Sequence, residues 1–250
     1  GGPPVQAAGQ IADIGGGALM AAFGILAALR ERDRSGEGQS VDVSMADGSL
    51  SWLAMVAGSY FCDGAVPRRG DPLLAGAVIC YRPYACADGW VTLGALEPKF
   101  WAAWCRGVDR EDLLEHQFDR PGTEAHAAVE AIFAGRTREE WRAFASAHDC
   151  CLEPVLELDE ALNSELVRAR EMVVEIPQPG AGRPVRQLGV PVKLSRTPGA
   201  VRAPGPGLGE HTGEVLAEAG LTPDEIAALT DTGAVAGPPD GGARGSFLSG

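Results

Sequence analysis

The chain has 250 residues, enough for one large domain or two small ones. Hydrophobic residues make up 45% and charged residues 22%, as in ordinary soluble globular proteins. With 21 Lys+Arg against 34 Asp+Glu, the net charge of −13 argues against binding of nucleic acid or an anionic membrane by the whole surface. We expect neither as a partner, although a local basic pocket for a phosphorylated ligand is compatible with this charge.

The cysteines and the longest apolar run indicate the compartment. The six cysteines form no Cys-x-x-Cys pair and no zinc-type spacing with histidine, so we expect free thiols, no metal site and a reducing, cytoplasmic location. The longest apolar run, near residues 18–29, is interrupted by glycine and is expected to be too short to span a bilayer. The cysteines are Cys62, Cys80, Cys86, Cys105, Cys150 and Cys151.

The first notable stretch is Gln10 to Leu19, in which Asp13 precedes Gly15, Gly16 and Gly17. An amphipathic pattern then predicts a helix over 18–32. On spacing alone, Asp13 is best interpreted as a helix N-cap with a glycine-rich turn behind it. The alternative is functional: bare glycine backbone and a helix start offer N–H groups to an oxygen that gains negative charge beside a carboxylate.

Downstream of this stretch, residues 39–45 alternate apolar and polar and predict a strand. Residues 50–61 predict a buried helix. A strand between two helices is typical of a layered α/β domain. After the linker-like residues 63–77, two apolar runs surround an Asp-Gly turn at 87–89 and predict a β-hairpin.

The remaining elements define two predicted domains and a tail. Helices are expected at 97–107, 122–134 and 137–148, followed by a short strand at 151–157 and a short helix at 158–163. From 177 to 209 the chain is rich in Pro and Gly, with one extended piece at 190–194; two short helices follow at 210–219 and 222–229. We therefore predict an α/β protein with part of a large, Rossmann-like layered domain (1–63 and 177–235), a small inserted α+β domain (64–176) and a disordered tail (236–250).

Several stretches in order resemble the family III CoA-transferase superfamily (CaiB/BaiF type), and within it the α-methylacyl-CoA racemases most closely. The resemblance covers about residues 1–235. It rests on these stretches: Asp13 with Gly15–Gly17; Gly36 to Met45 with Asp47-Gly48; Cys80-Tyr81 before Ala87-Asp-Gly89; Leu93-Gly-Ala-Leu-Glu97-Pro-Lys-Phe-Trp101; Pro191 to Pro198; and Gly207 to Thr212.

The resemblance implies an activity and site residues. Asp13 and Glu97 match the family's catalytic carboxylates, and Gly15, Gly16, Gly17 and Tyr81 are predicted to bind the CoA thioester. That thioester is a substrate, and no permanently bound cofactor is expected. Arg82 and Lys99 are the nearest basic candidates for CoA phosphates, but a solvated surface role is favoured for both. Family members form interlocked homodimers, which is the expected assembly here.

Three functions stay open at this point. In an acyl-CoA racemase, Asp13 exchanges a proton at the carbon next to the thioester carbonyl, and Glu97 supports a histidine on the opposite face. In a CoA transferase between carboxylic acids, Asp13 is a nucleophile that passes through an aspartyl-CoA intermediate. The chain begins with Gly1, and the family's N-terminal part with its histidine is expected to be missing; none of the four histidines here matches that role. A non-catalytic remnant is therefore the third reading.

Overall fold

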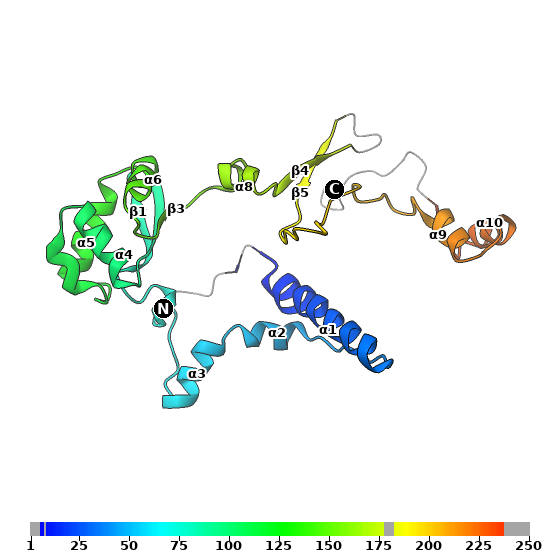
Figure 1. The fold of residues 1–250 in the computed structure, drawn as a ribbon, viewed down its shortest axis with the longest axis horizontal. Helices are drawn as coiled ribbons and strands as arrows, with labels where there is room; N and C mark the ends of the chain where they lie inside the picture. Colours follow the sequence, from blue (N-terminus) through cyan, green and yellow to red (C-terminus); the bar gives the residue numbers. More distant parts are fainter. Residues whose placement is uncertain (1–5, 8, 178–182, 238–250) are drawn as a thin grey trace. The chain divides into compact units, whose positions relative to one another are not determined.

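The computed structural model describes residues 6–7, 9–177 and 183–237 (Figure 1). Two compact units, Gly1–Val155 and Leu156–Gly250, are distinguished by their internal contacts, and each is described by itself. The domain boundaries predicted near residues 63 and 176 stay predictions. Of the tail predicted at 236–250, residues 238–250 lie outside the described part of the chain.

The first unit begins with a continuous helical rod. A π-helical segment, η1 (Ile11–Ala18), leads directly into α1 (Leu19–Ser35), which ends at Gly36 with φ +81°. The predicted helix is confirmed, but the predicted glycine-rich turn is wrong because Gly15–Gly17 are helical. The N-cap position belongs to Gln10, so the expectation that Asp13 caps the helix is also wrong. Packing against a neighbouring helix overrides the low helix propensity of glycine here.

The rod is longer and more apolar than the sequence pattern predicted. Ile11–Ser35 is 25 residues long and contains an 18-residue window with mean hydropathy 1.8, of which 11% is buried. By length and composition it is sufficient to cross a membrane, so the expectation that the apolar run is too short is wrong. A helix that packs inside a soluble protein passes the same test, and the expected absence of a membrane partner stays a prediction.

Two short helices follow the rod: α2 (Met45–Ser51) and α3 (Ala54–Asp63). The strand predicted at 39–45 is wrong. A strand needs a hydrogen-bonded neighbour, and none of the described residues pairs with this segment. Instead Ser44 caps α2, its hydroxyl accepting the Asp47 N–H at 3.2 Å. The helix predicted at 50–61 forms as two pieces, and its side chains are largely exposed rather than buried, with Leu50 65% exposed.

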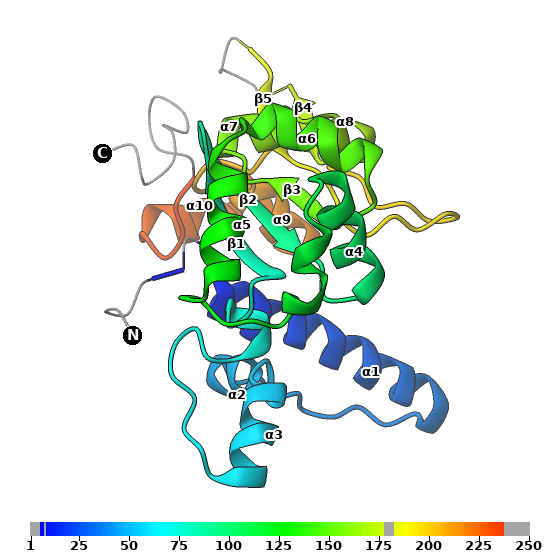
Figure 2. The ribbon, with the colours of Figure 1, turned by 90° about the vertical axis from the view of Figure 1, so that its left-hand side faces the viewer.

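The rest of the first unit is built on a small antiparallel sheet. Strands β1 (Tyr81–Cys86) and β2 (Gly89–Gly94) form the predicted hairpin, and β3 (Leu152–Pro154) pairs with the other edge of β2. Short 3-10 turns are η2 (Leu73–Ala75) and η3 (Glu111–His116). Three helices surround this sheet in Figure 2, as predicted: α4 (Pro98–Gly107), α5 (Glu124–Ala134) and α6 (Arg138–Ala147).

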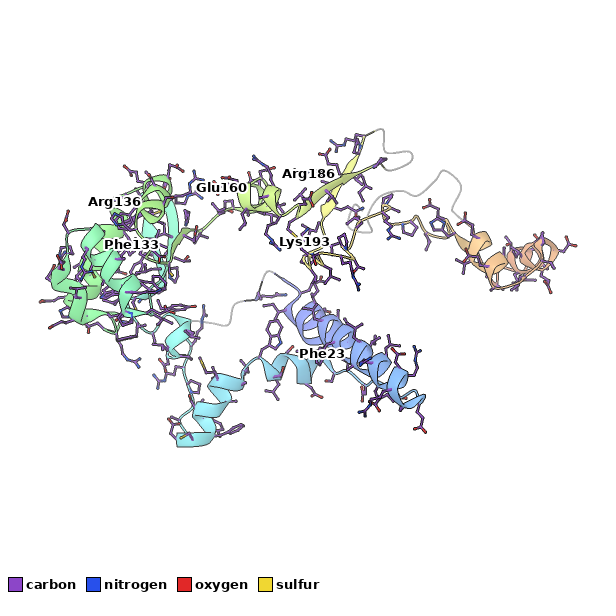
Figure 3. All side chains as sticks on the ribbon, viewed as in Figure 1. Phe23, Phe133, Arg136, Glu160, Arg186 and Lys193 are labelled. Carbon is purple, nitrogen blue, oxygen red and sulfur yellow. The ribbon has the colours of Figure 1, made fainter. Side chains whose placement is uncertain are left out.

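Stacked aromatic rings fill the core between this sheet and its helices. Phe133, labelled in Figure 3, is fully buried and lies 4.4 Å from Tyr84, 5.3 Å from Trp104 and 4.7 Å from Trp141, measured between ring centroids. The Tyr84 hydroxyl donates to the Ile79 carbonyl at 2.6 Å. The core is thus stabilised by apolar burial and by ring contacts together, and the buried hydroxyl of Tyr84 has a hydrogen-bond partner.

The second unit consists of small elements. Helices α7 (Leu158–Leu162) and α8 (Glu165–Ala169) precede a hairpin of β4 (Val173–Ile176) and β5 (Val185–Leu188). The hairpin was not predicted, and the extended piece expected at 190–194 forms no regular strand. The last helices of the described chain are α9 (Thr212–Glu218) and α10 (Pro223–Asp231), which lie within two residues of their predicted bounds.

Candidate active site

Asp13 lies in the first turn of the π-helical segment η1, and its side chain is exposed. The two cavities described in the structure are lined by other residues. Asp13 is therefore an accessible carboxylate on the rod, outside both of these cavities.

The three glycines beside Asp13 are packing positions as well as candidate binding positions. A Cβ on Gly15 would lie 2.6 Å from Cζ2 of Trp52, and a Cβ on Gly16 would lie 2.6 Å from the Ser49 hydroxyl and 2.7 Å from the Met45 carbonyl. Bare backbone at these positions lets α2 approach η1 closely. Their predicted role in binding a CoA thioester stays a prediction.

Glu97, the second predicted catalytic carboxylate, is exposed at the N-terminus of α4. Pro98 occupies the first helical turn, where a missing N–H costs little. Although Glu97 occupies the N-cap position, its side chain makes no capping hydrogen bond, so the carboxylate is not held against its own helix. It lies near Cys151: burial, then the negative charges of Asp149 and Glu97, raise the pKa of that thiol.

Tyr81, predicted to bind the thioester, is half-buried at the start of β1 and pairs across the hairpin with Gly94. Gly94 has no side chain, and a Cβ built there would lie 3.8 Å from Cε2 of Tyr81. The ring therefore occupies the space above Gly94, next to the strand end that leads into Glu97. Tyr81 and Glu97 thus both lie at the open end of the hairpin, where β1 begins and β2 ends.

Each of the four histidines is engaged with a neighbour close in sequence. His116 pairs with Asp119 at 2.9 Å, His211 with Glu214 at 3.0 Å, and the His148 ring packs 4.4 Å from Phe144. His126 is buried, its Nε2 lies 3.4 Å from Glu130, and burial lowers its pKa. The expectation that none of the four acts as the partner of Asp13 stays a prediction.

The two predicted catalytic carboxylates lie on different elements: Asp13 belongs to η1, and Glu97 is the N-cap residue of α4. Sequence reasoning missed the residues that fix the glycine stretch, namely Gly48, Ser49 and Trp52. Gly48 is buried against Gly16, and the run from Ala46 to Ser49, with its small residues, is the sequence signal from which a close helix crossing could have been predicted. The cavity at Arg82 and Arg120 was likewise not predicted.

Comparison with known proteins gives the family. The model of CoA-transferase family III matches residues 1–212. An alpha-methylacyl-CoA racemase of Mus musculus is 35% identical over 91% of this chain, and a succinyl-CoA:mesaconate CoA-transferase of Haloarcula hispanica is 31% identical over 88%. The chain belongs to CoA-transferase family III, so the recognition made from the sequence is confirmed.

Solved structures show the same fold. A CAIB/BAIF family protein from Brucella suis matches with a TM-score of 0.65 at 22% identity, over 86% of this chain and 57% of the other. A hypothetical protein from Mycobacterium tuberculosis matches with a TM-score of 0.68 at 23% identity, over 85% and 57%. The chain spans 58% of the mouse protein and 56% of the archaeal one, so it covers somewhat more than half the length of its curated relatives.

Proposed function

We propose that this protein is an acyl-CoA racemase or epimerase that exchanges the proton on the carbon next to the thioester carbonyl. The observation that carries the proposal is the 35% identity to an alpha-methylacyl-CoA racemase over 91% of the chain. The geometry of Glu97 supports it, because a carboxylate at a helix start without a capping bond is free to act on a neighbouring group.

The chemistry assigns Asp13 one half of a proton exchange. Its carboxylate takes the α-proton, and the electron pair of the broken C–H bond moves to the thioester oxygen as an enolate. A second acid on the opposite face returns a proton to the same carbon, which inverts the centre. Backbone N–H groups directed at the enolate oxygen would stabilise it by about 3 kcal/mol each. The second acid, a histidine in the family pattern, comes from outside the described residues.

The exposed apolar side chains of the rod support the proposal that a further protein surface packs against this site. Phe23, labelled in Figure 3, is 74% exposed and Leu26 67%, and Ile11 and Ile14 beside Asp13 are each about half exposed. Apolar surface of this extent marks an interaction site. We propose that the protein is a cytoplasmic, interlocked homodimer. In it, the second copy and the rest of the large layered α/β domain, to which the rod belongs, cover this apolar face. They also complete the wall of the acyl-CoA site.

A CoA transferase is the second candidate, favoured by the 31% identity to a succinyl-CoA:mesaconate CoA-transferase. In that reaction the Asp13 carboxylate attacks the thioester carbonyl, CoA leaves, and the returning thiolate converts the resulting mixed anhydride to an aspartyl-CoA thioester as the first acid departs. An exposed carboxylate serves this role as readily as it serves proton exchange. The two candidates differ in whether a bond to Asp13 forms.

The test compares both reactions with the full-length protein. One enantiomer of a 2-methylacyl-CoA is incubated in D2O, and deuterium at the α-carbon is followed by mass spectrometry. A racemase gives one deuterium per inverted centre without an added acid. Hydroxylamine added during turnover modifies Asp13 only if the aspartyl thioester forms. Absence of exchange together with an Asp13 hydroxamate would replace the racemase by the transferase. CoA binding to the 250-residue chain addresses the remnant reading, because tight binding would contradict it.

A further inference from the structure

A second cavity lies in the first unit, is lined by residues outside the glycine stretch, and holds about 480 Å³. Its walls are the turn that runs through Arg69 and Gly76, the first half of β1 at Arg82 and Pro83, and the loop at Arg120. A backbone hydrogen bond from the Ile79 N–H to the Asp119 carbonyl, at 3.0 Å, ties the chain before β1 to the loop at Arg120. The cavity is thus a built feature of the sheet edge.

The lining of this cavity is strongly basic for a chain of net charge −13. Three arginines, Arg69, Arg82 and Arg120, line it, and Asp71 is the acidic residue among them. The Asp71 carboxylate already accepts the Arg68 N–H at 2.9 Å, which closes its turn. Positive charge therefore exceeds negative charge in the cavity, and an anion placed there is attracted by several guanidinium groups.

Arg82 gives the clearest sign of a ligand. Its Nε and Nη1 are shielded from solvent and have no hydrogen-bond partner in the described part of the chain. The guanidinium also lies over the face of the Tyr84 ring, 5.7 Å from its carbon to the ring centroid. Two shielded guanidinium nitrogens without a hydrogen-bond partner are an unfavourable arrangement. Because Arg82 also lines the cavity, a shift of its side chain toward an acceptor bound there would supply the missing partner.

Phosphate fits this lining. Guanidinium groups present planar pairs of donors that match the oxygens of phosphate, and several of them together can surround a doubly charged group. The turn beside them contains Gly70 and Gly76 with φ of +87° and +92°, so its backbone is bare where it borders the cavity. A space of about 480 Å³ is large enough for a phosphorylated small molecule.

We propose that the cavity lined by Arg69, Arg82 and Arg120 binds the phosphate group of a small molecule. The site is separate from Asp13, and its existence does not depend on whether the protein is a racemase or a transferase. Arg82 donates from inside the sheet edge, and Arg120 donates from the exposed loop opposite. The turn at 69–77 positions the third guanidinium.

The test measures binding of inorganic phosphate and of adenosine 3′,5′-bisphosphate to the protein by calorimetry, at low ionic strength without other anions. The variants are Arg82→Gln, Arg82→Lys and Arg120→Gln. The matched control is Arg106→Gln, an exposed arginine of the same unit that pairs with Glu111 at 3.6 Å and lies outside the cavity. Near-ultraviolet circular dichroism checks the aromatic core of each variant.

Wild-type protein is expected to bind at least one of the two probes, and Arg106→Gln is expected to bind that probe as tightly as wild type does. Arg82→Gln and Arg120→Gln are each expected to weaken binding by about tenfold or more, while Arg82→Lys keeps part of it. Tighter binding of the bisphosphate assigns the site to a phosphate ester, and equal binding assigns it to free phosphate. If Arg82→Gln fails to fold, Arg120→Gln decides alone. Binding of neither probe, or unchanged binding in both glutamine variants, would overturn the proposal.

Discussion

The backbones of Gly16 and Gly48 touch where α2 crosses η1: a Cβ on Gly48 would overlap the Gly16 carbonyl and lie 2.7 Å from the Gly16 Cα. Neither residue can carry a side chain at this distance without moving a helix. The contact fixes the segment that carries Asp13, so the stability of this crossing and the placement of the candidate catalytic carboxylate are linked.

The first prediction follows from that contact. Gly48→Ala is expected to lower the free energy of unfolding by about 1–3 kcal/mol, because the added methyl group meets backbone rather than a flexible side chain. Urea denaturation measures the change. Gly58→Ala on α3 is the matched control, since a Cβ there meets nothing within 4 Å. This control should be neutral or stabilising by about 0.5–1 kcal/mol. Equal effects of the two substitutions would contradict the close crossing.

The second prediction concerns the thiols. Burial raises the pKa of Cys80 to about 11, of Cys105 to about 12 and of Cys150 to about 11, so these three remain protonated near neutral pH. Because the thiolate is the reactive form, Cys62, which is exposed, should react with a disulfide reagent at pH 8 well before them. Peptide mapping after timed labelling identifies the order. Early labelling of Cys105 in folded protein would show that the aromatic core is open.

The third prediction is a pH dependence at the start of α6. The Glu140 carboxylate accepts the Thr137 N–H at 2.8 Å and the Thr137 hydroxyl at 2.9 Å, and these bonds lower its pKa below the ordinary 4.5. A lowered pKa in the folded state means that the ionised group stabilises the fold above pH 4.5 and that this contribution disappears as the pH falls through the lowered value.

Glu140→Gln should therefore be less stable than wild type at pH 7, and the difference should shrink on acidification below pH 4.5. Thermal unfolding at several pH values measures it. The control is Glu139→Gln on the same helical turn, which removes an exposed pair with Arg142 and leaves the capping box in place. A difference between wild type and Glu140→Gln that grows toward low pH would contradict the assignment.

The elements that the sequence predicted correctly are those specified by short-range chemistry. The Asp88-Gly89 turn defines the hairpin of β1 and β2, and Thr137 with Glu140 begins α6, because each signal lies within a few residues. The strand predicted at 39–45 depended on a partner strand that no pattern within the segment could provide. The β4–β5 hairpin was missed because its proline- and glycine-rich surroundings are also typical of irregular chain.

The candidate site likewise has features that the sequence predicted and features that it did not. Asp13, Glu97 and Tyr81 were found through family resemblance, and the structure gives each a definite local setting. The helical state of Gly15–Gly17 was not predicted, because it depends on Gly48 and Trp52, which lie far along the chain and pack against them. Sequence patterns report local propensity, whereas this close approach is a tertiary effect.

The central claim is that the Asp13 carboxylate exchanges the α-proton of an acyl-CoA. Asp33 on the same rod provides a matched control, because it is also an exposed carboxylate and pairs only with the neighbouring Arg32, at 3.5 Å, among the described salt bridges. Asp13→Asn and Asp33→Asn remove one negative charge each from the same helix, so their comparison separates chemistry from charge.

The decisive measurement is the rate of deuterium incorporation at the α-carbon of a 2-methylacyl-CoA in D2O, for full-length wild type, Asp13→Asn and Asp33→Asn. We expect a loss of about 10²–10⁴-fold for Asp13→Asn at unchanged stability, and wild-type exchange for Asp33→Asn. Wild-type exchange in Asp13→Asn would contradict the account.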